Sequence, residues 1–399
     1  MKPNRQITGI TFKGASVLLL AGAVFFVFQS SCRTSNAEKA DYRTRILELP
    51  PATPLEASES ASLQEACQNW YDKYLAKSHF NGGVLVAKGG NIIFEQYKGE
   101  SKLGSGLAFG DTTPIHIASV SKTFTAMAVL KLCEEGRLKL EDPLSKYFPA
   151  FTFPDITIRT LLNHRSGLPN YTGFMDESDW NKSVALRNED VLQYLITKKK
   201  TLPNWGRADR SFSYCNTNFA LLALLVEQIT GNTFADFLQQ RFFGPLDMKH
   251  TFVRTDADSI RVNPSYEANG RLIPDNYMDK VYGDKNIYST PRDLFTWERA
   301  LRSGLLFKPE TLAAAYTPYS NEKPGRRNYG LGWRLLGFPE GGMMIYHNGW
   351  WHGNNASFLR LPEDEICIIA LGSRFTKLVY KTKDLVSVFN EKAAAETEE

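Results

Sequence analysis

The sequence predicts a mixed α/β fold in which an antiparallel sheet is flanked by helices and interrupted by an inserted helical subdomain. Strand-like runs stand near both ends of the folded region, and apolar patterns with helical spacing fill the middle. The chain has 399 residues, of which 43% are hydrophobic and 23% are charged. This composition is typical of a folded globular protein and not of a disordered one.

The N-terminal segment 1–31 has the features of an export signal. Lys2, Arg5 and Lys13 are its only charged residues, and residues 15–28 form an unbroken apolar stretch. Fourteen helical residues span about 21 Å, which is shorter than the ~30 Å hydrocarbon core of a bilayer. A cleaved signal peptide is therefore favoured over a permanent membrane-spanning helix.

Cys32 follows Ser30 and Ser31, as in the cleavage box of a bacterial lipoprotein. This arrangement predicts that Cys32 is lipidated and anchors the mature chain to the membrane. Gln29 stands where an aliphatic residue is usual, so ordinary cleavage and an uncleaved anchor remain alternatives. The simplest alternative is that Cys32 is an unmodified thiol.

The predicted domain order after the signal peptide is a tether, a catalytic domain and a tail. Residues 32–61 are polar and rich in proline, which predicts a flexible tether. The sequence from Ser62 to Glu65 fits a helix-capping box, so order is expected from residue 62. The catalytic domain is predicted over 62–392, and residues 393–399 are expected to form a disordered tail.

The elements of the domain follow from periodicity and from turn residues. Two strands joined at Gly89-Gly90 predict a hairpin. Three helices fill the middle, four strands return late, and an amphipathic helix closes the domain. The predicted strands are 82–88, 91–97, 329–336, 343–349, 355–361 and 365–371, and the predicted helices are 119–136, 217–231, 235–243 and 377–390.

Charge and cysteine content exclude several classes of function. Without the basic signal segment the chain is nearly neutral, so no nucleic-acid partner is expected. The four remaining cysteines stand far apart with no C-x-x-C pair, and we interpret them as small buried side chains. The histidines His79, His116 and His250 lack the spacing of metal ligands, so no metal and no organic cofactor is expected.

The sequence Ser119-Val-Ser-Lys122 at the start of a predicted helix is the first candidate for chemistry. Residues i and i+3 lie on one helical face, so the hydroxyl and the amine are expected to meet. The positive end of the helix favours a developing oxyanion and, with burial, a neutral amine that can accept a proton. A second copy, Ser320 to Lys323, lies in a loop-forming sequence and is attributed to chance.

Two further motifs follow in order. Tyr214-Cys-Asn216 precedes a predicted helix, and His347-Asn348-Gly349 lies in a late strand. With these three motifs the chain resembles the serine β-lactamase and penicillin-binding family, whose motifs are S-x-x-K, Y-x-N or S-x-N, and K/H-x-G. The flanks 156–169, 209–231 and 329–333 resemble its larger branch, which includes class C β-lactamases, D-alanyl-D-alanine carboxypeptidases and esterases.

The resemblance implies the β-lactamase/transpeptidase-like fold and a role for each motif residue. Ser119 would attack a carbonyl group and form an acyl-enzyme, with Lys122 and Tyr214 sharing the role of base. Asn216 would orient Lys122 and bind the amide of the substrate. The main-chain N–H groups of Ser119 and Trp350 would form the oxyanion hole.

The third motif departs from the family pattern. His347 would polarise the side of the site on which Tyr214 lies, or it would bind a carboxylate of the substrate. Asn348 replaces the usual Thr or Ser, which makes strong penicillinase activity doubtful, and Gly349 completes the motif. The side chains of Trp350 and Trp351 would either line the entrance of the pocket or pack in the core of the sheet. We expect His164 to have a structural role.

The sequence thus predicts a monomeric serine hydrolase of the cell envelope, anchored to the membrane and facing the periplasm. Its expected substrate is a small amide or ester, such as a D-alanyl peptide or a β-lactam-like molecule. The alternative is a catalytically idle lipoprotein that senses peptidoglycan or β-lactams.

Overall fold

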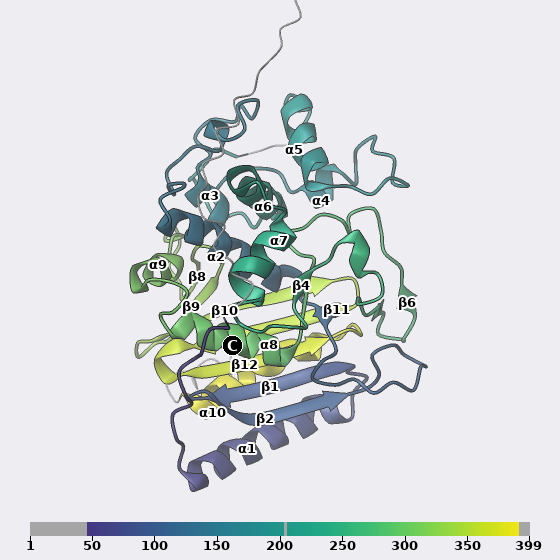
Figure 1. Cartoon of the computed structure of the whole chain (residues 1–399), viewed down its shortest axis with the longest axis vertical. Coiled ribbons are helices and arrows are strands. Elements are labelled where there is room, and N and C mark those ends of the chain that lie inside the picture. Colours follow the sequence, from purple (N-terminus) through teal and green to yellow (C-terminus); the bar gives the residue numbers. More distant parts are fainter. Residues whose placement is uncertain (1–45, 203–205, 391–399) are drawn as a thin grey trace, which may run out of the picture. The chain divides into compact units, whose positions relative to one another are not determined.

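A computed structural model describes residues 46–202 and 206–390, so the predicted signal peptide, Cys32 and the tail 393–399 lie outside the described residues. Its centre is a seven-stranded antiparallel sheet in the order β2-β1-β12-β11-β10-β9-β8 (Figure 1). These strands are β1 (Gly82–Lys88), β2 (Asn91–Lys98), β8 (Arg327–Tyr329), β9 (Arg334–Gly337), β10 (Met343–Trp351), β11 (Asn354–Leu361) and β12 (Ile366–Gly372). The mixed α/β fold with strands from both ends of the domain is confirmed.

The segment between β2 and β8 forms the helical part of the domain and two small sheets. Its helices are α2 (Ser121–Glu134), α3 (Ile158–Leu162), α4 (Tyr171–Phe174), α5 (Asn188–Thr197), α6 (Asn216–Thr230), α7 (Phe234–Leu238), α8 (Pro291–Arg302) and α9 (Pro309–Ala315). Its strands are β3 (Ile115–His116), β4 (Phe252–Val253), β5 (Ser265–Tyr266), β6 (Leu272–Ile273) and β7 (Ile287–Ser289).

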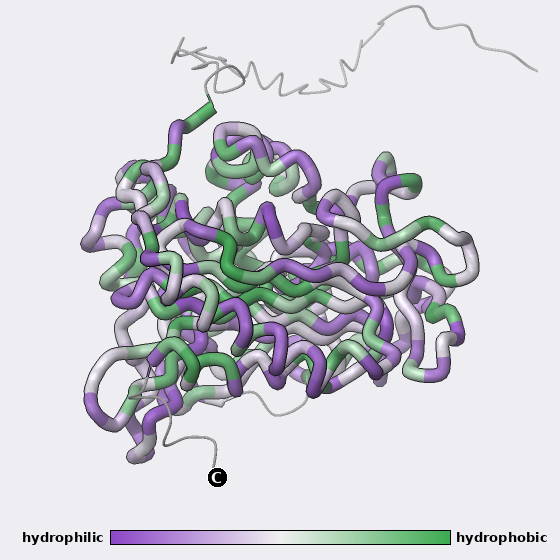
Figure 2. Tube along the Cα trace, turned by 90° about the horizontal axis from the view of Figure 1, so that it is seen from below, coloured by the Kyte–Doolittle hydropathy of each residue, from purple (hydrophilic) through white to green (hydrophobic). Residues whose placement is uncertain are grey.

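Two hydrophobic clusters cover the two faces of the large sheet. On one face the first helix, α1 (Ala57–Tyr71), packs with the C-terminal helix α10 (Val386–Phe389). On the other face α8 packs against β1 and β12, and α2 and α6 belong to the same hydrophobic cluster. Figure 2 shows hydrophobic segments running through the interior between hydrophilic outer loops. The sheet is therefore buried on both sides, which explains the nearly continuous apolar run of β12.

Three predicted boundaries are wrong. Helix α1 begins at Ala57 instead of residue 62, and Glu59 in its first turn pairs with Lys88 at 2.5 Å. The predicted strand 329–336 is two strands, because Gly332 turns the chain against helix α2, where a Cβ would lie 2.2 Å from Ala126 Cβ. The predicted helix 377–390 is a 3₁₀ helix over Lys377–Leu385 before α10, and the carbonyl group of Lys381 in it accepts a hydrogen bond from Trp70 Nε1 at 2.9 Å.

Part of the segment that was predicted as a tether contacts the domain. Residues 46–56 lie along the domain, where Leu47 N donates to Pro245 O at 2.7 Å and Thr53 N donates to Gly89 O at 2.6 Å. Within residues 46–202 and 206–390, no helix combines the length and apolar character needed to cross a bilayer. The four cysteines of this region are free thiols, and three of them are buried as predicted, whereas Cys133 is partly exposed.

Candidate active site

The hydroxyl of Ser119 and the amine of Lys122 meet at the start of helix α2. Ser119 lies in a single 3₁₀ turn, Ala118–Val120, directly before the helix. Lys122 Nζ lies 2.9 Å from Ser119 Oγ and 2.8 Å from the main-chain oxygen of Asp284. The Lys122 side chain is fully buried. A buried amine in hydrogen-bond contact with a half-buried hydroxyl is the arrangement that a serine nucleophile requires.

The residue before Ser119 adopts the left-handed backbone conformation, which residues other than glycine rarely adopt. Ala118 has a φ of +48°, and its N–H donates to His116 Nδ1 at 3.1 Å. Burial lowers the pKa of His116 to about 3, so the imidazole is neutral and can accept this hydrogen bond. A left-handed residue costs about 1–3 kcal/mol and persists only where its surroundings enforce it. Here it turns the Ser119 hydroxyl toward Lys122.

Gly349 in strand β10 lies against the main chain of the nucleophile turn. A Cβ atom at Gly349 would lie 2.3 Å from Ile117 O and 3.1 Å from Ser119 N. No larger residue fits without a shift of the backbone. This contact brings the residue after Gly349 next to the N–H group of Ser119, which is where a pair of oxyanion donors is needed.

Tyr214 lies just before helix α6 and stacks over the buried amine. Lys122 Nζ is 5.0 Å from the centroid of the Tyr214 ring. The ring of His164 packs on Tyr214 with a centroid distance of 4.3 Å, and His164 Nδ1 accepts a hydrogen bond from Cys215 N at 3.0 Å. His164 therefore supports Tyr214, which fits its expected structural role.

Asn216 is the first residue of α6, and its side-chain oxygen is buried. Within the described part of the chain, this oxygen has no hydrogen-bond partner. No hydrogen bond joins Asn216 to Lys122 there, in contrast to the expected orienting role. A buried acceptor without a hydrogen-bond partner costs free energy, so a donor group of a substrate could form a favourable hydrogen bond with this oxygen.

His347 does not fit the expected role of receiving a substrate carboxylate. Its imidazole is fully buried, with Nδ1 2.7 Å from Asn348 O and Nε2 3.1 Å from the hydroxyl of Tyr329. Nδ1 must donate to the carbonyl group, so Nε2 accepts from Tyr329. Burial, helped by the nearby positive charge of Arg334, lowers the pKa of His347 well below its usual value. The ring is therefore neutral and has no free nitrogen.

The side chains of Asn348 and Trp350 point away from the site, because successive side chains along a strand point to opposite faces of the sheet. Asn348 Oδ1 accepts a hydrogen bond from Ser357 Oγ at 3.2 Å on the other face of the sheet. Trp350 is 65% exposed and packs on Phe375, so only its main chain can serve as an oxyanion donor. Trp351 turns inward instead, and its indole donates to Asp279 at 2.5 Å.

Three residues near the site were not predicted from the sequence. Asp284 contacts Lys122 through its main-chain oxygen, and no sequence pattern predicts such a contact. Tyr329 lies in the motif YGLGW, and Arg334 directly follows that motif. The guanidinium carbon of Arg334 is 5.1 Å from the centroid of the Tyr214 ring, so the motif position could have directed attention to it.

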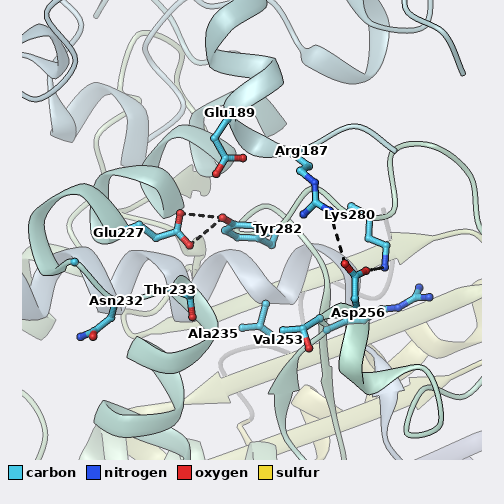
Figure 3. A pocket seen from close by; sticks show the side chains of 13 residues that line it. Arg187, Glu189, Glu227, Asn232, Thr233, Ala235, Val253, Asp256, Lys280 and Tyr282 are labelled. Carbon is cyan, nitrogen blue, oxygen red and sulfur yellow. Dashed lines mark hydrogen bonds and ion pairs between the residues drawn. The ribbon is translucent and has the colours of Figure 1, made fainter. Parts of the chain in front are cut away.

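A separate hollow of about 500 Å³ lies between helices α5, α6 and α7 and strand β4 (Figure 3). Tyr282 donates a hydrogen bond to Glu227 there at 2.9 Å, and Asp256 pairs with Lys280 and Arg187. None of the site residues described above lines it. In the described part of the chain, no group of three or more His, Cys, Asp or Glu side chains is placed to hold a metal ion.

Comparison with known proteins matches residues 68–390 to the family model "Beta-lactamase". The chain is 28% identical over 323 residues to penicillin-binding protein 4* of Bacillus subtilis, covering 77% of this chain and 71% of that protein. It is 27% identical over 269 residues to the teichoic acid D-alanine hydrolase of Staphylococcus aureus strain NCTC 8325. That match covers 65% of this chain and 64% of the relative, which is slightly less than two thirds of its length.

Among solved structures, a penicillin-binding protein from Bacillus halodurans has the same fold. Its TM-score is 0.69 at 22% sequence identity, and the match covers 82% of this chain and 98% of the other.

Proposed function

Because this chain belongs to the β-lactamase family and is a serine hydrolase, we propose that it cleaves a D-alanyl amide or ester through an acyl-enzyme on Ser119. The observation that carries the proposal is the contact of 2.9 Å between Lys122 Nζ and Ser119 Oγ. An alcohol is a weak nucleophile unless a base removes its proton, and Lys122 is the only amine in contact with this hydroxyl within the described residues.

The proposed acylation step uses four groups. Ser119 Oγ bonds to the substrate carbonyl carbon while its proton passes to Lys122. The carbonyl oxygen becomes an oxyanion that accepts hydrogen bonds from the N–H groups of Ser119 and Trp350. The bond to the leaving group then breaks, and Tyr214 gives that group a proton. Tyr214, now deprotonated, takes a proton from a water molecule whose oxygen bonds to the ester carbon, the bond to Ser119 Oγ breaks, and Lys122 returns its proton to Ser119.

The polar groups around Ser119 favour a small acyl group with an amide. The unpartnered oxygen of Asn216 can accept an N–H of the substrate. The buried neutral His347 and the outward Asn348 remove the usual third-motif groups for a β-lactam carboxylate. Weak penicillinase activity is therefore expected, and a D-alanyl substrate, as in the name of the teichoic acid D-alanine hydrolase, is favoured.

We also propose that the protein acts in the cell envelope as a monomer anchored through Cys32. The support is the basic and apolar leader followed by Ser30-Ser31-Cys32. Cys32→Ala in the full chain tests the anchor. The variant is expected to lose metabolic labelling by palmitate and to leave the membrane fraction, and continued labelling would contradict the proposal.

A substrate panel tests the activity. It contains a D-alanyl-D-alanine peptide, an N-acetyl-D-alanyl ester and a chromogenic cephalosporin, each assayed with the wild type and with Ser119→Ala. We expect release of D-alanine or of the alcohol by the wild type alone, with the cephalosporin the poorest substrate. Stable acylation without turnover of any member would instead indicate the idle sensor.

A further inference from the structure

A buried polar cluster lies next to the amine of Lys122, between helix α4 and the segment that precedes strand β7. It consists of Tyr171, Asp284 and Lys285, and each of these residues is at most 3% exposed. The hydroxyl of Tyr171 donates to Asp284 Oδ2 at 3.0 Å and accepts from Lys285 Nζ at 2.5 Å. The proposed acylation step uses none of these three side chains.

The main chain of this cluster contacts the site. Lys122 Nζ donates to the main-chain oxygen of Asp284 at 2.8 Å, and the carboxylate of Asp284 faces Tyr171 and Lys285 instead. Asp284 Oδ1 has no hydrogen-bond partner among the described residues, and its distance to Lys285 Nζ is 3.8 Å. The charge of this carboxylate is therefore balanced by Lys285 and not by Lys122.

The surroundings of Lys285 stabilise a positive charge. Its Nζ also donates to a main-chain oxygen at 3.3 Å and lies 4.7 Å from the centroid of the Trp351 ring. Burial lowers the pKa of Lys285, whereas the negative charges of Asp284 and Asp279 act in the opposite direction. The nearby ring of His116 is neutral, because its own pKa is lowered to about 3. Lys285 thus forms a buried ion pair with Asp284.

Asp284 is the carboxylate that could hold a proton on Lys122. Within the described part of the chain, the other titratable groups around this amine are phenols, thiols, imidazoles and cations, namely Tyr214, Cys215, His164, His347, Arg334 and Lys285. Burial lowers the pKa of both imidazoles and raises the pKa of the thiol, so these three groups are neutral.

We propose that Lys285 is a positioning residue that keeps the amine of Lys122 free of a proton by neutralising the Asp284 carboxylate. A buried carboxylate requires a counter-charge. Without Lys285, a proton on Lys122 would supply it, because Lys122 Nζ already contacts the main chain of Asp284. This inference rests on the proposed function, in which Lys122 takes the proton of Ser119.

The pH dependence of the reaction with a fluorophosphonate tests the inference. In the wild type we expect the rate to rise with pH as Lys122 loses its proton. In Lys285→Met the charge of Asp284 is unbalanced, so the midpoint of this rise should move up by about 1–2 pH units. In Asp284→Asn the charge of Lys285 is unbalanced, so the midpoint should move down. The double variant restores the balance and should return the midpoint toward the wild-type value.

Lys280→Met is the matched control. Lys280 lies on the same segment and pairs with an aspartate, Asp256, but it lines the separate hollow. Its removal should leave the midpoint unchanged. Thermal unfolding checks that every variant folds, and the direction of the shift in Asp284→Asn decides the question if Lys285→Met does not fold.

An unchanged midpoint in Lys285→Met, or shifts in the same direction in the two single variants, would overturn the inference. If no D-alanyl substrate is hydrolysed but the two midpoints move in opposite directions, the proposed function fails and the role of Lys285 stands. If D-alanyl substrates are hydrolysed and the midpoints do not move, only the role of Lys285 fails. A wild-type chain that does not react with the fluorophosphonate overturns both.

Discussion

The hydroxyl of Tyr329 donates a hydrogen bond to His347 Nε2 over 3.1 Å, and both side chains are buried. This bond fixes the third-motif histidine as a neutral ring whose other nitrogen faces a carbonyl group. His347 is therefore a positioning residue behind Tyr214, and the positive charge on that side of the site belongs to Arg334.

Removing the Tyr329 hydroxyl should destabilise the domain. Tyr329→Phe leaves His347 Nε2 buried without a donor, which costs about 1–3 kcal/mol in the free energy of unfolding. Urea unfolding measures the loss. Tyr194→Phe is the control, because the Tyr194 hydroxyl has no hydrogen-bond partner within the described residues and its ring only stacks on Phe174. Equal losses in the two variants would show that the Tyr329–His347 bond contributes nothing.

Replacing the buried amine should stop acylation while the fold remains. Lys122→Met keeps the length of the side chain and removes the group that contacts Ser119 Oγ. The rate of reaction with a fluorophosphonate is expected to fall roughly 10²- to 10⁴-fold, as for other losses of a general base. Lys131→Met, on the same helix but bonded to Leu306 O, should react at the wild-type rate. A rate for Lys122→Met within threefold of the wild type would exclude Lys122 as the base.

A methyl group at Gly349 should block the site. In Gly349→Ala the Cβ meets Ile117 O and Ser119 N, so either β10 or the nucleophile turn must shift. We expect acylation to fall at least 100-fold, because a misplacement of about 1 Å has effects of that size. At Gly110 a Cβ meets nothing within 4 Å, so Gly110→Ala is the control. Normal acylation by Gly349→Ala would contradict the proposed contact.

The buried histidines should make the fold sensitive to mild acid. Burial lowers the pKa of His116 from 6.5 to about 3 and that of His164 and His347 well below 6.5. The unfolded chain then binds more protons between these values, so the free energy of unfolding falls as the pH falls from about 6.5 toward 3. For His116 alone the loss between about pH 7 and pH 5 is about 2 kcal/mol.

His116→Gln should remove this share of the pH dependence, although the variant starts from a lower stability. Urea unfolding at a series of pH values measures the slope, and the same substitution at the exposed His79 controls for the change of residue type. If His116→Gln and the wild type lose stability equally between these pH values, the ring does not titrate as its burial requires.

Periodicity was enough to predict the strands of the hairpin β1–β2 and the helices α2 and α6, because each buries a regular apolar face. The break between β8 and β9 was missed, since it depends on the contact of Gly332 with a helix about 200 positions earlier in the sequence. Motif spacing brought Ser119 and Lys122 together correctly. Because side chains alternate along β10, those of His347 and Trp351 lie on the face of Gly349, whereas those of Asn348 and Trp350 lie on the opposite face, which the motif pattern alone does not show. Asp284 contacts Lys122 through its main-chain oxygen, so its residue type does not predict a place in the site.

Mass spectrometry of the chain after reaction with a fluorophosphonate tests the identity of the nucleophile most directly. The account predicts one adduct, on the peptide that contains Ser119, which is absent from Ser119→Ala although that variant shows the same thermal unfolding as the wild type. An adduct that persists in Ser119→Ala, or a wild-type chain that stays unmodified, would contradict it.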